Sequence, residues 1–379
     1  MSNNKDFKVK NGVKPTVYHE GLGTVVSAVA GYSLANASYD SVSFSVAAQD
    51  TLPSDIFFKP DGTKMYVAGD GGNDINEYNL STAWDISTAS FVQVFSVAGQ
   101  DTGVAGVFFK PDGLKMYVVG FTNDSVYEYT LSTAWDISTS SFVQSFSVSG
   151  QDTGPVALFF KPDGTKMYVT GQTGVDVNEY TLSTAWDIST ASYAQNFSIV
   201  AQGSIPRGLF FKPDGTKMFT SSPEIDEYAL STPWNISTAS YIQNFSVAGQ
   251  DASPLNLSFK DDGTKMYVVG AGNDAIYQYS TTIDSRTLDL STGSVFQLTP
   301  TSNIQLNLSN PADSGTVSGA TLLLSASGTA YTITYDASVQ WAGGTAPTSP
   351  DVGDTDVLVF TTRDGGTSYK AALAIDGAA

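Results

Sequence analysis

Short apolar runs separated by turn residues recur along the chain. The string FFKPDGTKMYV begins at Phe159, close copies begin at Phe57, Phe108 and Phe210, and a looser copy, SFKDDGTKMYV, begins at Ser258. Each repeat contains four apolar runs, which in the second copy are GVFF, KMYVVG, VYEYTL and SFVQSFSV. Runs of this length, bounded by Gly, Pro, Asn and Asp, predict β-strands.

The spacing of the repeats predicts the architecture. Phe58, Phe109, Phe160 and Phe211 are 51 residues apart, and Phe259 follows 48 residues later. The Pro-Asp-Gly between the first two runs predicts a hairpin turn, because Pro fixes φ and Gly accepts positive φ. Four strands per unit, repeated in tandem, are typical of the blades of a β-propeller.

The order of the strands predicts how the ring closes. The first three strands of the unit occur five times, and the fourth strand, FSV or FSI, also occurs five times, starting at Phe44 before the first FFKPDG. The repeats therefore begin with a fourth strand and end with a third strand, AIYQYS. We expect Ser43 to Val46 to pair beside the strand around Tyr279, which removes the exposed edges of an open array. The sequence predicts five blades.

The two faces of this ring differ in charge. The hairpin lysines and the LSTAWDISTAS loops share one face, from which both ends of the propeller are expected to emerge. The other face carries repeated aspartates, together with Arg207 and the loop SSPEID, which is three residues shorter than its counterparts. We expect this acidic face to contact a ligand. The candidate ligand-facing residues are Asp74, Asp101, Asp124, Asp152, Asp176, Arg207, Glu224, Asp251 and Asp274.

Composition limits the class of partner. The 379-residue chain has a net charge of −19 and no basic run, so we expect no nucleic-acid partner. Because it has no cysteine, it has no disulfide framework and no thiolate metal site. No run approaches the ~18 apolar residues of a membrane helix, and we expect no membrane insertion.

The repeat string also carries a family resemblance. FFKPDGTKMYV followed by VYEYTL resembles the SPDG-x-x-x-YV pattern of YVTN-type and TolB-type propeller repeats, over residues 43–280. The resemblance implies the blade architecture and indicates no substrate.

Both ends of the chain resemble bacteriophage virion proteins. NKDFKVKNGV is similar to the start of tail-fibre and related virion proteins of marine bacteriophages, where such a segment attaches the protein to the particle. From Asp284 onward, LDLSTGSVF, LSNP, VQWAGGTAP and DVLVFTTRDGGTSY resemble, in this order, a C-terminal module of phage tail and fibre proteins. Alternating apolar and polar residues there predict a small antiparallel β-sandwich-like domain. The predicted domains are an attachment segment at 1–36, an all-β five-bladed propeller at 37–281 and this domain at 282–379.

Exact repetition argues against catalysis, because a catalytic site needs groups with unlike pKa values placed together. The single histidine, His19, lies outside the repeats. We expect no catalytic residue and no cofactor. A carboxylate pair near the axis, such as Glu224 with Asp226, is the alternative, since five-bladed glycosidases use paired carboxylates.

Two other repeated residue types have a structural and a functional interpretation. The repeated aspartates suggest calcium, but their spacing matches no calcium loop, and we expect no metal site. The repeated tryptophans suggest stacking on sugars, but their fixed place before DIST or NIST favours packing under each blade. These are Trp84, Trp135, Trp186 and Trp234.

Together these patterns predict a non-enzymatic virion protein, a tail fibre or appendage that presents a propeller face to a host-surface glycan or receptor. One alternative is a connector that binds other virion proteins, and a second is a polysaccharide depolymerase. The resemblance to phage fibres implies a homo-oligomer, such as a trimer.

Overall fold

The computed structural model describes residues 22–378, apart from residues 36, 204, 302–303, 329–330 and 337. Most of the predicted attachment segment, including His19, lies outside these residues. The chain divides into two compact units. Of the described residues, 30–282 form the propeller unit, and 22–29 with 283–378 form the sandwich unit.

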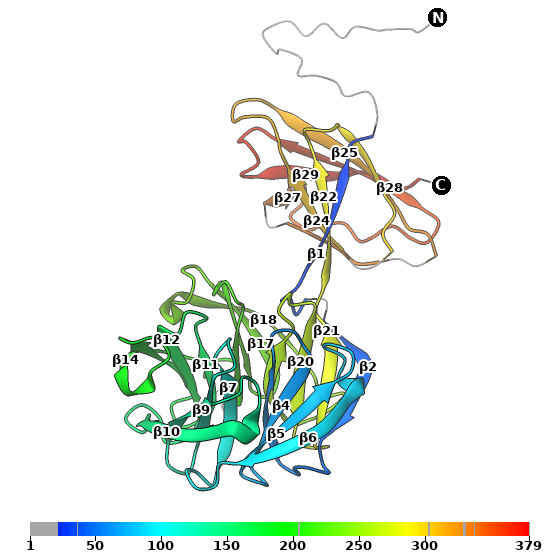
Figure 1. Cartoon of the computed structure of the whole chain (residues 1–379). Coiled ribbons are helices and arrows are strands. Elements are labelled where there is room, and N and C mark those ends of the chain that lie inside the picture. Colours follow the sequence, from blue (N-terminus) through cyan, green and yellow to red (C-terminus); the bar gives the residue numbers. More distant parts are fainter. Residues whose placement is uncertain are drawn as a thin grey trace, which may run out of the picture. The chain divides into compact units, whose positions relative to one another are not determined.

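The propeller unit contains five four-stranded antiparallel sheets, which confirms the predicted blade number (Figure 1). The inner strands are β3 (Pro53–Phe58), β7 (Val104–Phe109), β11 (Pro155–Phe160), β15 (Gly208–Phe211) and β19 (Pro254–Phe259). The second strands are β4 (Lys64–Gly69), β8 (Lys115–Gly120), β12 (Lys166–Gly171), β16 (Lys217–Ser221) and β20 (Lys265–Gly270). The third strands are β5 (Asp74–Leu80), β9 (Ser125–Leu131), β13 (Asp176–Leu182), β17 (Ile225–Leu230) and β21 (Ala275–Ser280). The outer strands are β6 (Ala89–Ser96), β10 (Ser140–Ser147), β14 (Ala191–Ser198), β18 (Ala239–Phe245) and β2 (Ser38–Ser45).

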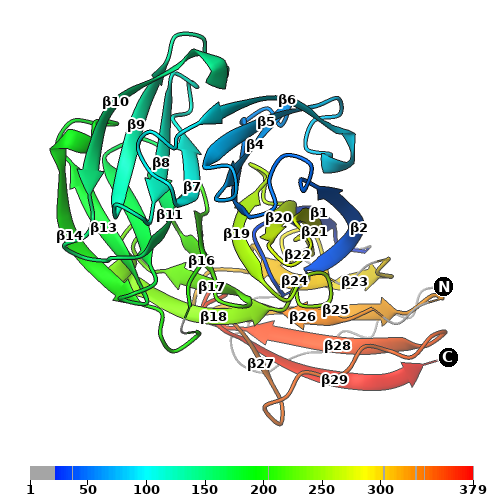
Figure 2. The ribbon, with the colours of Figure 1, turned by 90° about the horizontal axis from the view of Figure 1, so that it is seen from below.

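The inner strands contact one another in a ring, from β3 through β7, β11, β15 and β19 back to β3. Figure 2 shows β7, β11 and β19 toward the middle of the ring and β6, β10, β14 and β18 at its rim. A short 3₁₀ turn precedes each of these four outer strands. These turns are η1 (Ile86–Thr88), η2 (Ile137–Thr139), η3 (Ile188–Thr190) and η4 (Ile236–Thr238).

The repeated KPDG forms the predicted hairpin turn. In the first blade, Asp61 Oδ1 accepts hydrogen bonds from the backbone N–H of Thr63 at 3.0 Å and from its hydroxyl at 2.6 Å. Gly62 has a φ of 71°, and a β-carbon there would overlap the ring of Trp84. Glycine is therefore needed at this turn for its backbone angle and for the close tryptophan. The repeated tryptophans pack on these turns, as the sequence predicted.

The predicted closure is confirmed. Strand β2 pairs antiparallel with β21, with Phe44 opposite Ile276 and Tyr39 opposite Tyr279. The backbone N–H of Tyr32 donates to the carbonyl of Gly263 at 2.8 Å, and the backbone N–H of Thr281 donates to Thr264 at 3.1 Å. The chain thus enters and leaves the propeller beside its last hairpin, on the predicted lysine face.

Tyr32 takes the place of the missing fifth tryptophan. Its φ is 59°, close to the 66° of Trp84, and a β-carbon on Gly263 would overlap its ring, as one on Gly62 would overlap Trp84. The sequence repeat did not reveal this substitution, because Tyr32 precedes the repeats and lies far from Gly263 along the chain.

Buried carboxylates join neighbouring blades. Glu128 accepts from Lys115 Nζ at 2.5 Å, from Gln144 Nε2 at 2.9 Å and from the backbone N–H of Ile188, in the next blade, at 3.4 Å. The equivalent glutamates of the other blades are Glu77, Glu179 and Glu227. The fifth blade has Gln278 at this position, and Asp40 from β2 supplies the carboxylate. It accepts from Lys265 at 2.6 Å and from Gln278 at 2.9 Å.

The sandwich unit contains two sheets around one core. One sheet has the order β1 (Val25–Ala30), β22 (Ile283–Asp289), β24 (Ile304–Ser309), β26 (Ile333–Tyr335). The other has the order β23 (Val295–Leu298), β25 (Ser318–Ser325), β28 (Thr355–Thr362), β29 (Tyr369–Ala378), β27 (Val339–Trp341). Leu288 and Leu306 of the first sheet pack with Leu322, Leu358 and Phe360 of the second.

Two details of the sandwich unit differ from the sequence-based expectation. Strands β22, β24 and β26 pair in parallel, so the unit is mixed rather than purely antiparallel. Alternation of apolar and polar residues predicts strands but does not specify the direction of their neighbours. Strand β1 belongs to this unit, although it lies inside the predicted attachment segment.

One inner-strand position carries a buried carboxyl group. Asp55 is 3% exposed, and its carboxyl accepts from the backbone N–H groups of Ile56 at 2.6 Å and of Val107, in the next blade, at 2.7 Å. Asn256 holds the equivalent position in the fifth blade and accepts from Leu257 and Leu209 through one oxygen. Burial raises the pKa of Asp55 well above its ordinary value, because no cation compensates the charge.

We predict that Asp55→Asn stabilises the protein at neutral pH. A folded-state pKa above the unfolded value means that the wild type loses stability as the pH rises above about 4, whereas an amide does not titrate. Thermal unfolding at pH 4 and pH 7.5 should show a gain of several degrees at pH 7.5 alone. The matched variant Asn256→Asp should show the opposite change. An equal effect of Asp55→Asn at both pH values would contradict the prediction.

Candidate functional site

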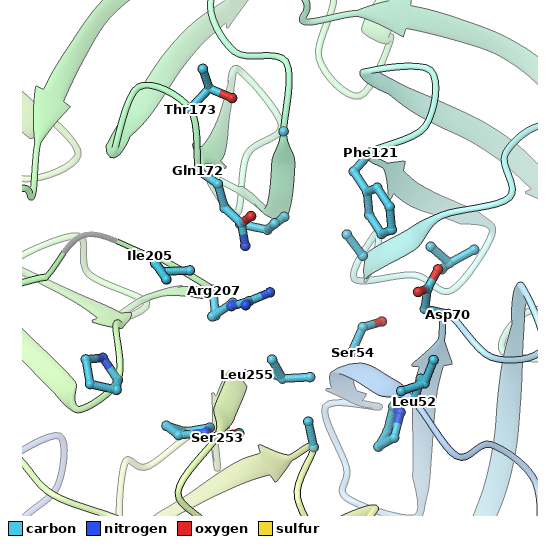
Figure 3. A pocket seen from close by; sticks show the side chains of 18 of the residues that line it. Leu52, Ser54, Asp70, Phe121, Gln172, Thr173, Ile205, Arg207, Ser253 and Leu255 are labelled. Carbon is cyan, nitrogen blue, oxygen red and sulfur yellow. The ribbon is translucent and has the colours of Figure 1, made fainter.

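A cavity of about 930 Å³ lies where the five blades meet. Its walls come from the connections between outer and inner strands and from those between second and third strands, so it lies on the face opposite the hairpins. Figure 3 shows Arg207, Phe121, Asp70 and Leu255 around this space.

Two positions of the repeat supply much of the cavity wall. One lies three residues before each FFK or SFK string and is occupied by Ser54, Ala105, Val156, Arg207 and Leu255. The other directly follows the second strand and is occupied at the cavity by Asp70, Phe121, Gln172 and Ala271. The flanking FF and KMYV residues are nearly constant, whereas these positions differ in every blade. The cavity is therefore asymmetric although the scaffold is repeated.

Arg207 is the only cation among the described residues that line the cavity. Its backbone N–H donates to Ser221 at 2.9 Å, which fixes the start of β15. Its guanidinium points into the cavity in Figure 3. None of the ion pairs in the described part of the chain includes it. An uncommitted positive charge therefore faces the cavity.

Two further polar side chains mark the cavity. Asp70 is the only carboxylate among the described lining residues, and partial burial, then the charge of Asp50, raise its pKa above the ordinary value. Gln172 lies on the blade next to that of Arg207. Its Nε2 is buried and donates to no group among the described residues. A buried donor without an acceptor is uncommon in folded proteins.

The aspartates of the GQD strings lie inside the loops. Asp101 is 1% exposed and accepts from the backbone N–H groups of Gly103 at 2.9 Å and Asn123 at 3.1 Å and from the hydroxyl of Tyr127 at 2.9 Å. Asp152 and Asp251 make equivalent backbone contacts. These carboxylates tie two connections of each blade together, and they shape the rim without lining the cavity.

The aspartates between second and third strands also stay outside the cavity. Asp124 and Asp274 have φ values of 47° and 48°, which are typical of turn residues. Asp176 accepts from Asn178 and Asn196 at 2.6 Å each, and Asp74 accepts from Asn76 at 2.7 Å. Of the nine candidate residues, the structure places only Arg207 on the cavity wall.

The carboxylate pair considered for glycosidase chemistry lies elsewhere. Asp226 is buried in β17, and Glu224 binds the side chain of Asn244 on the outer strand β18. Burial, and then the charge of Glu224, raise the pKa of Asp226 to about 7. Neither residue lines the cavity. No group of three or more metal-ligating side chains occurs among the described residues, nor does any helix long and apolar enough to cross a membrane.

Arg207 was identified because it interrupts the repeat, and the same signal marks the other lining residues. Phe121, Gln172 and Asp70 follow the second strand at positions that the repeat leaves variable. Aligning the five copies and selecting their variable positions would have revealed them, whereas selecting repeated carboxylates pointed to the loops.

Comparison with known proteins identifies no family. No family model and no curated protein matches the chain. A putative 6-phosphogluconolactonase from Bacteroides uniformis is 16% identical over 60% of this chain and 68% of its own, with a TM-score of 0.40. The periplasmic gluconolactonase PpgL of Pseudomonas aeruginosa is 18% identical over 60% and 66%, with a TM-score of 0.39. A functionally unknown protein from Desulfotomaculum acetoxidans is 14% identical over 86% and 89%, with a TM-score of 0.37. At this level the similarities assign no activity to this chain.

We predict that Asp226→Asn stabilises the protein at alkaline pH. Since the folded-state pKa is about 7, the wild type loses stability between about pH 4 and pH 7 and loses no more above pH 7. The free energy of unfolding of the variant should exceed that of the wild type by an amount that grows over the same pH range and reaches at most about 4 kcal/mol. The new amide can donate to Glu224 as Asn76 donates to Asp74. Urea unfolding from pH 4 to pH 9 measures this difference.

The control for this prediction is Asn178→Asp, which creates a second carboxyl beside Asp176 in the third blade. It should lower the free energy of unfolding as the pH rises. If Asp226→Asn already gave its full gain in free energy of unfolding at pH 4, the raised pKa of Asp226 would be contradicted.

Proposed function

We propose that the propeller is a non-catalytic binding module that takes a host-surface saccharide into its axial cavity, within a virion tail fibre or appendage. The observation that carries the proposal is the asymmetric cavity, where the otherwise repeated blades differ from one another. Ligand sites are typically apolar cavities of this size with a few polar groups that set orientation.

The chemistry of the wall suits a saccharide. Leu52, Phe121 and Leu255 offer apolar surface, and Phe121 offers an aromatic ring for the C–H face of a sugar. Ser54, Thr153, Gln172, Thr173 and Ser253 supply hydrogen-bonding groups on several sides. A sugar carries both kinds of surface on one small ring, so it can use both sets of contacts at once.

The arrangement favours binding over hydrolysis. Glycoside hydrolysis ordinarily uses two carboxyl groups that flank the bond to be cleaved. In the described part of the wall Asp70 is the single carboxylate, and the Glu224 and Asp226 pair is outside it. The virion setting is supported by the resemblance of both ends of the chain to phage tail and fibre proteins.

A connector that binds other virion proteins is the second candidate, and one observation favours it. The outer strands expose apolar side chains in four blades. The most exposed are Phe91, Val94, Phe142, Val143, Tyr193, Tyr241 and Ile242. Such side chains at the rim would suit a protein partner.

We predict that Ser253→Trp abolishes binding to surface polysaccharides. Ser253 is exposed on the cavity wall, and an indole there would fill part of the cavity. Labelled protein should bind cells or purified surface polysaccharides of a bacterial panel, and the variant should bind at least tenfold more weakly. The control, Leu114→Trp, places the same indole on an exposed hairpin residue of the opposite face and should bind like the wild type.

Three results would count against the proposal. Undiminished binding by Ser253→Trp would remove the cavity from the interaction. Loss of binding in Leu114→Trp, or in variants with polar replacements of the outer-strand residues, would indicate that a different surface binds the ligand. Release of reducing sugar from a bound polysaccharide would favour the depolymerase.

A further inference from the structure

We propose that the axial cavity selects an anionic saccharide, whose carboxylate or sulfate ester is held by Arg207 and Gln172. The inference rests on the proposed function and specifies its ligand class. Both groups are hydrogen-bond donors on adjacent blades, and both residues line the cavity (Figure 3). The Nε2 of Gln172 is enclosed by protein here, so its amide must rotate toward the cavity to meet a ligand. Neither donor is paired with a side chain in the described part of the chain.

Arg207 has the form of an anion-binding group. A guanidinium carries donors in a planar fork that matches the two oxygens of a carboxylate or sulfate. Most arginines near acidic side chains form ion pairs, and this chain has 37 acidic residues and 18 basic ones. Arg207 nevertheless has no ion pair in the described structure, and it shares the cavity wall with the apolar Ile205, Pro223 and Leu255. A charge in such surroundings gains most from a bound anion.

Gln172 supplies the second, independent observation. The buried Nε2 of its amide has no acceptor among the described residues. Leaving such a donor unpaired is unfavourable, and a ligand oxygen would satisfy it. Because Gln172 and Arg207 lie on neighbouring blades, one anionic group can accept from both.

The nearby acidic side chains do not occupy the guanidinium. Asp50 already accepts from the backbone N–H groups of Leu52 at 2.6 Å and Gly72 at 2.8 Å, and Asp152 accepts from Gly154 at 2.7 Å. Asp70 lies across the cavity from Arg207 in Figure 3 and can accept hydroxyl groups of the same ligand. The wall thus offers an anion site on one side and a hydroxyl site on the other.

The test measures binding of the full-length chain to three probes by isothermal titration calorimetry. The probes are a uronate oligosaccharide from alginate, a sulfated oligosaccharide from κ-carrageenan, and neutral maltohexaose. We expect at least one anionic probe to bind tenfold or more tightly than maltohexaose. The better anionic probe distinguishes a carboxylate from a sulfate ligand.

The variants test the roles of the two donors. Arg207→Gln should lower the affinity for the anionic probe at least tenfold, and Arg207→Lys should lower it less. Gln172→Leu should lower the same affinity severalfold. Lys161→Gln removes the same charge from the opposite face, where Lys161 pairs with Asp163, and should stay within twofold of the wild type. Unchanged unfolding temperatures would show that each variant is folded.

The outcomes separate this inference from the proposed function. Equal binding of neutral and anionic probes, or an unaffected Arg207→Gln variant, overturns the anion site. If Ser253→Trp still abolishes binding, the saccharide cavity stands. If no probe binds, the cell-binding assay decides. Loss of cell binding in Arg207→Gln but not in Lys161→Gln supports the inference, whereas undiminished cell binding by Arg207→Gln overturns it. A wild type that binds neither probes nor cells refutes both.

Discussion

The propeller is built around a buried glutamate in four of its five blades, namely Glu77, Glu128, Glu179 and Glu227. A buried charge costs several kcal/mol unless it is paired and hydrogen-bonded, so its partners must be in place. Glu128 obtains them from its own blade, through Lys115, and from the next blade, through the backbone of Ile188. At the closure the same demand is met differently, because Gln278 is neutral and Asp40 of β2 supplies the charge to Lys265. The lysine of the fifth blade is therefore paired by the closing strand, through Asp40, which is partly exposed and bonds within that blade.

This division of labour explains why the chemistry lies at the axis. The hairpin turn requires particular residues in every blade, and the tryptophan upon it and the buried glutamate repeat in four of them. The cavity positions border open space on one side, so fewer contacts restrict their side chains than at the turns, although Ala105 and Val156 also pack in a core cluster. Ser54 and Arg207 hold equivalent places yet differ completely in chemistry. The scaffold can thus keep its stability while the wall changes, which is a suitable arrangement for a binding protein.

The blades and their closure were predictable because strand order and turn chemistry are local properties that a repeat displays five times. Tyr32 and Asp40 were not, since they replace a tryptophan and a glutamate from a segment outside the repeats. The aspartates of the GQD strings were assigned to ligand contact, yet their partners are backbone N–H groups, which no sequence pattern displays. Arg207 was found because it breaks the repeat. Gln172 was overlooked, because the significance of its amide depends on a missing acceptor that only the structure reveals.

Asymmetry determines what a five-bladed cavity can recognise. If all five wall positions were alike, a ligand could bind in five equivalent rotations, and its orientation would carry no information. A single guanidinium removes that degeneracy, because an anionic group can then occupy only one sector of the ring. Asp70, on a blade that is not adjacent to that of Arg207, fixes a second direction. Two unlike charges that do not pair with each other define an axis across the cavity, and a ligand with an acidic group at one end and hydroxyls at the other can align along it.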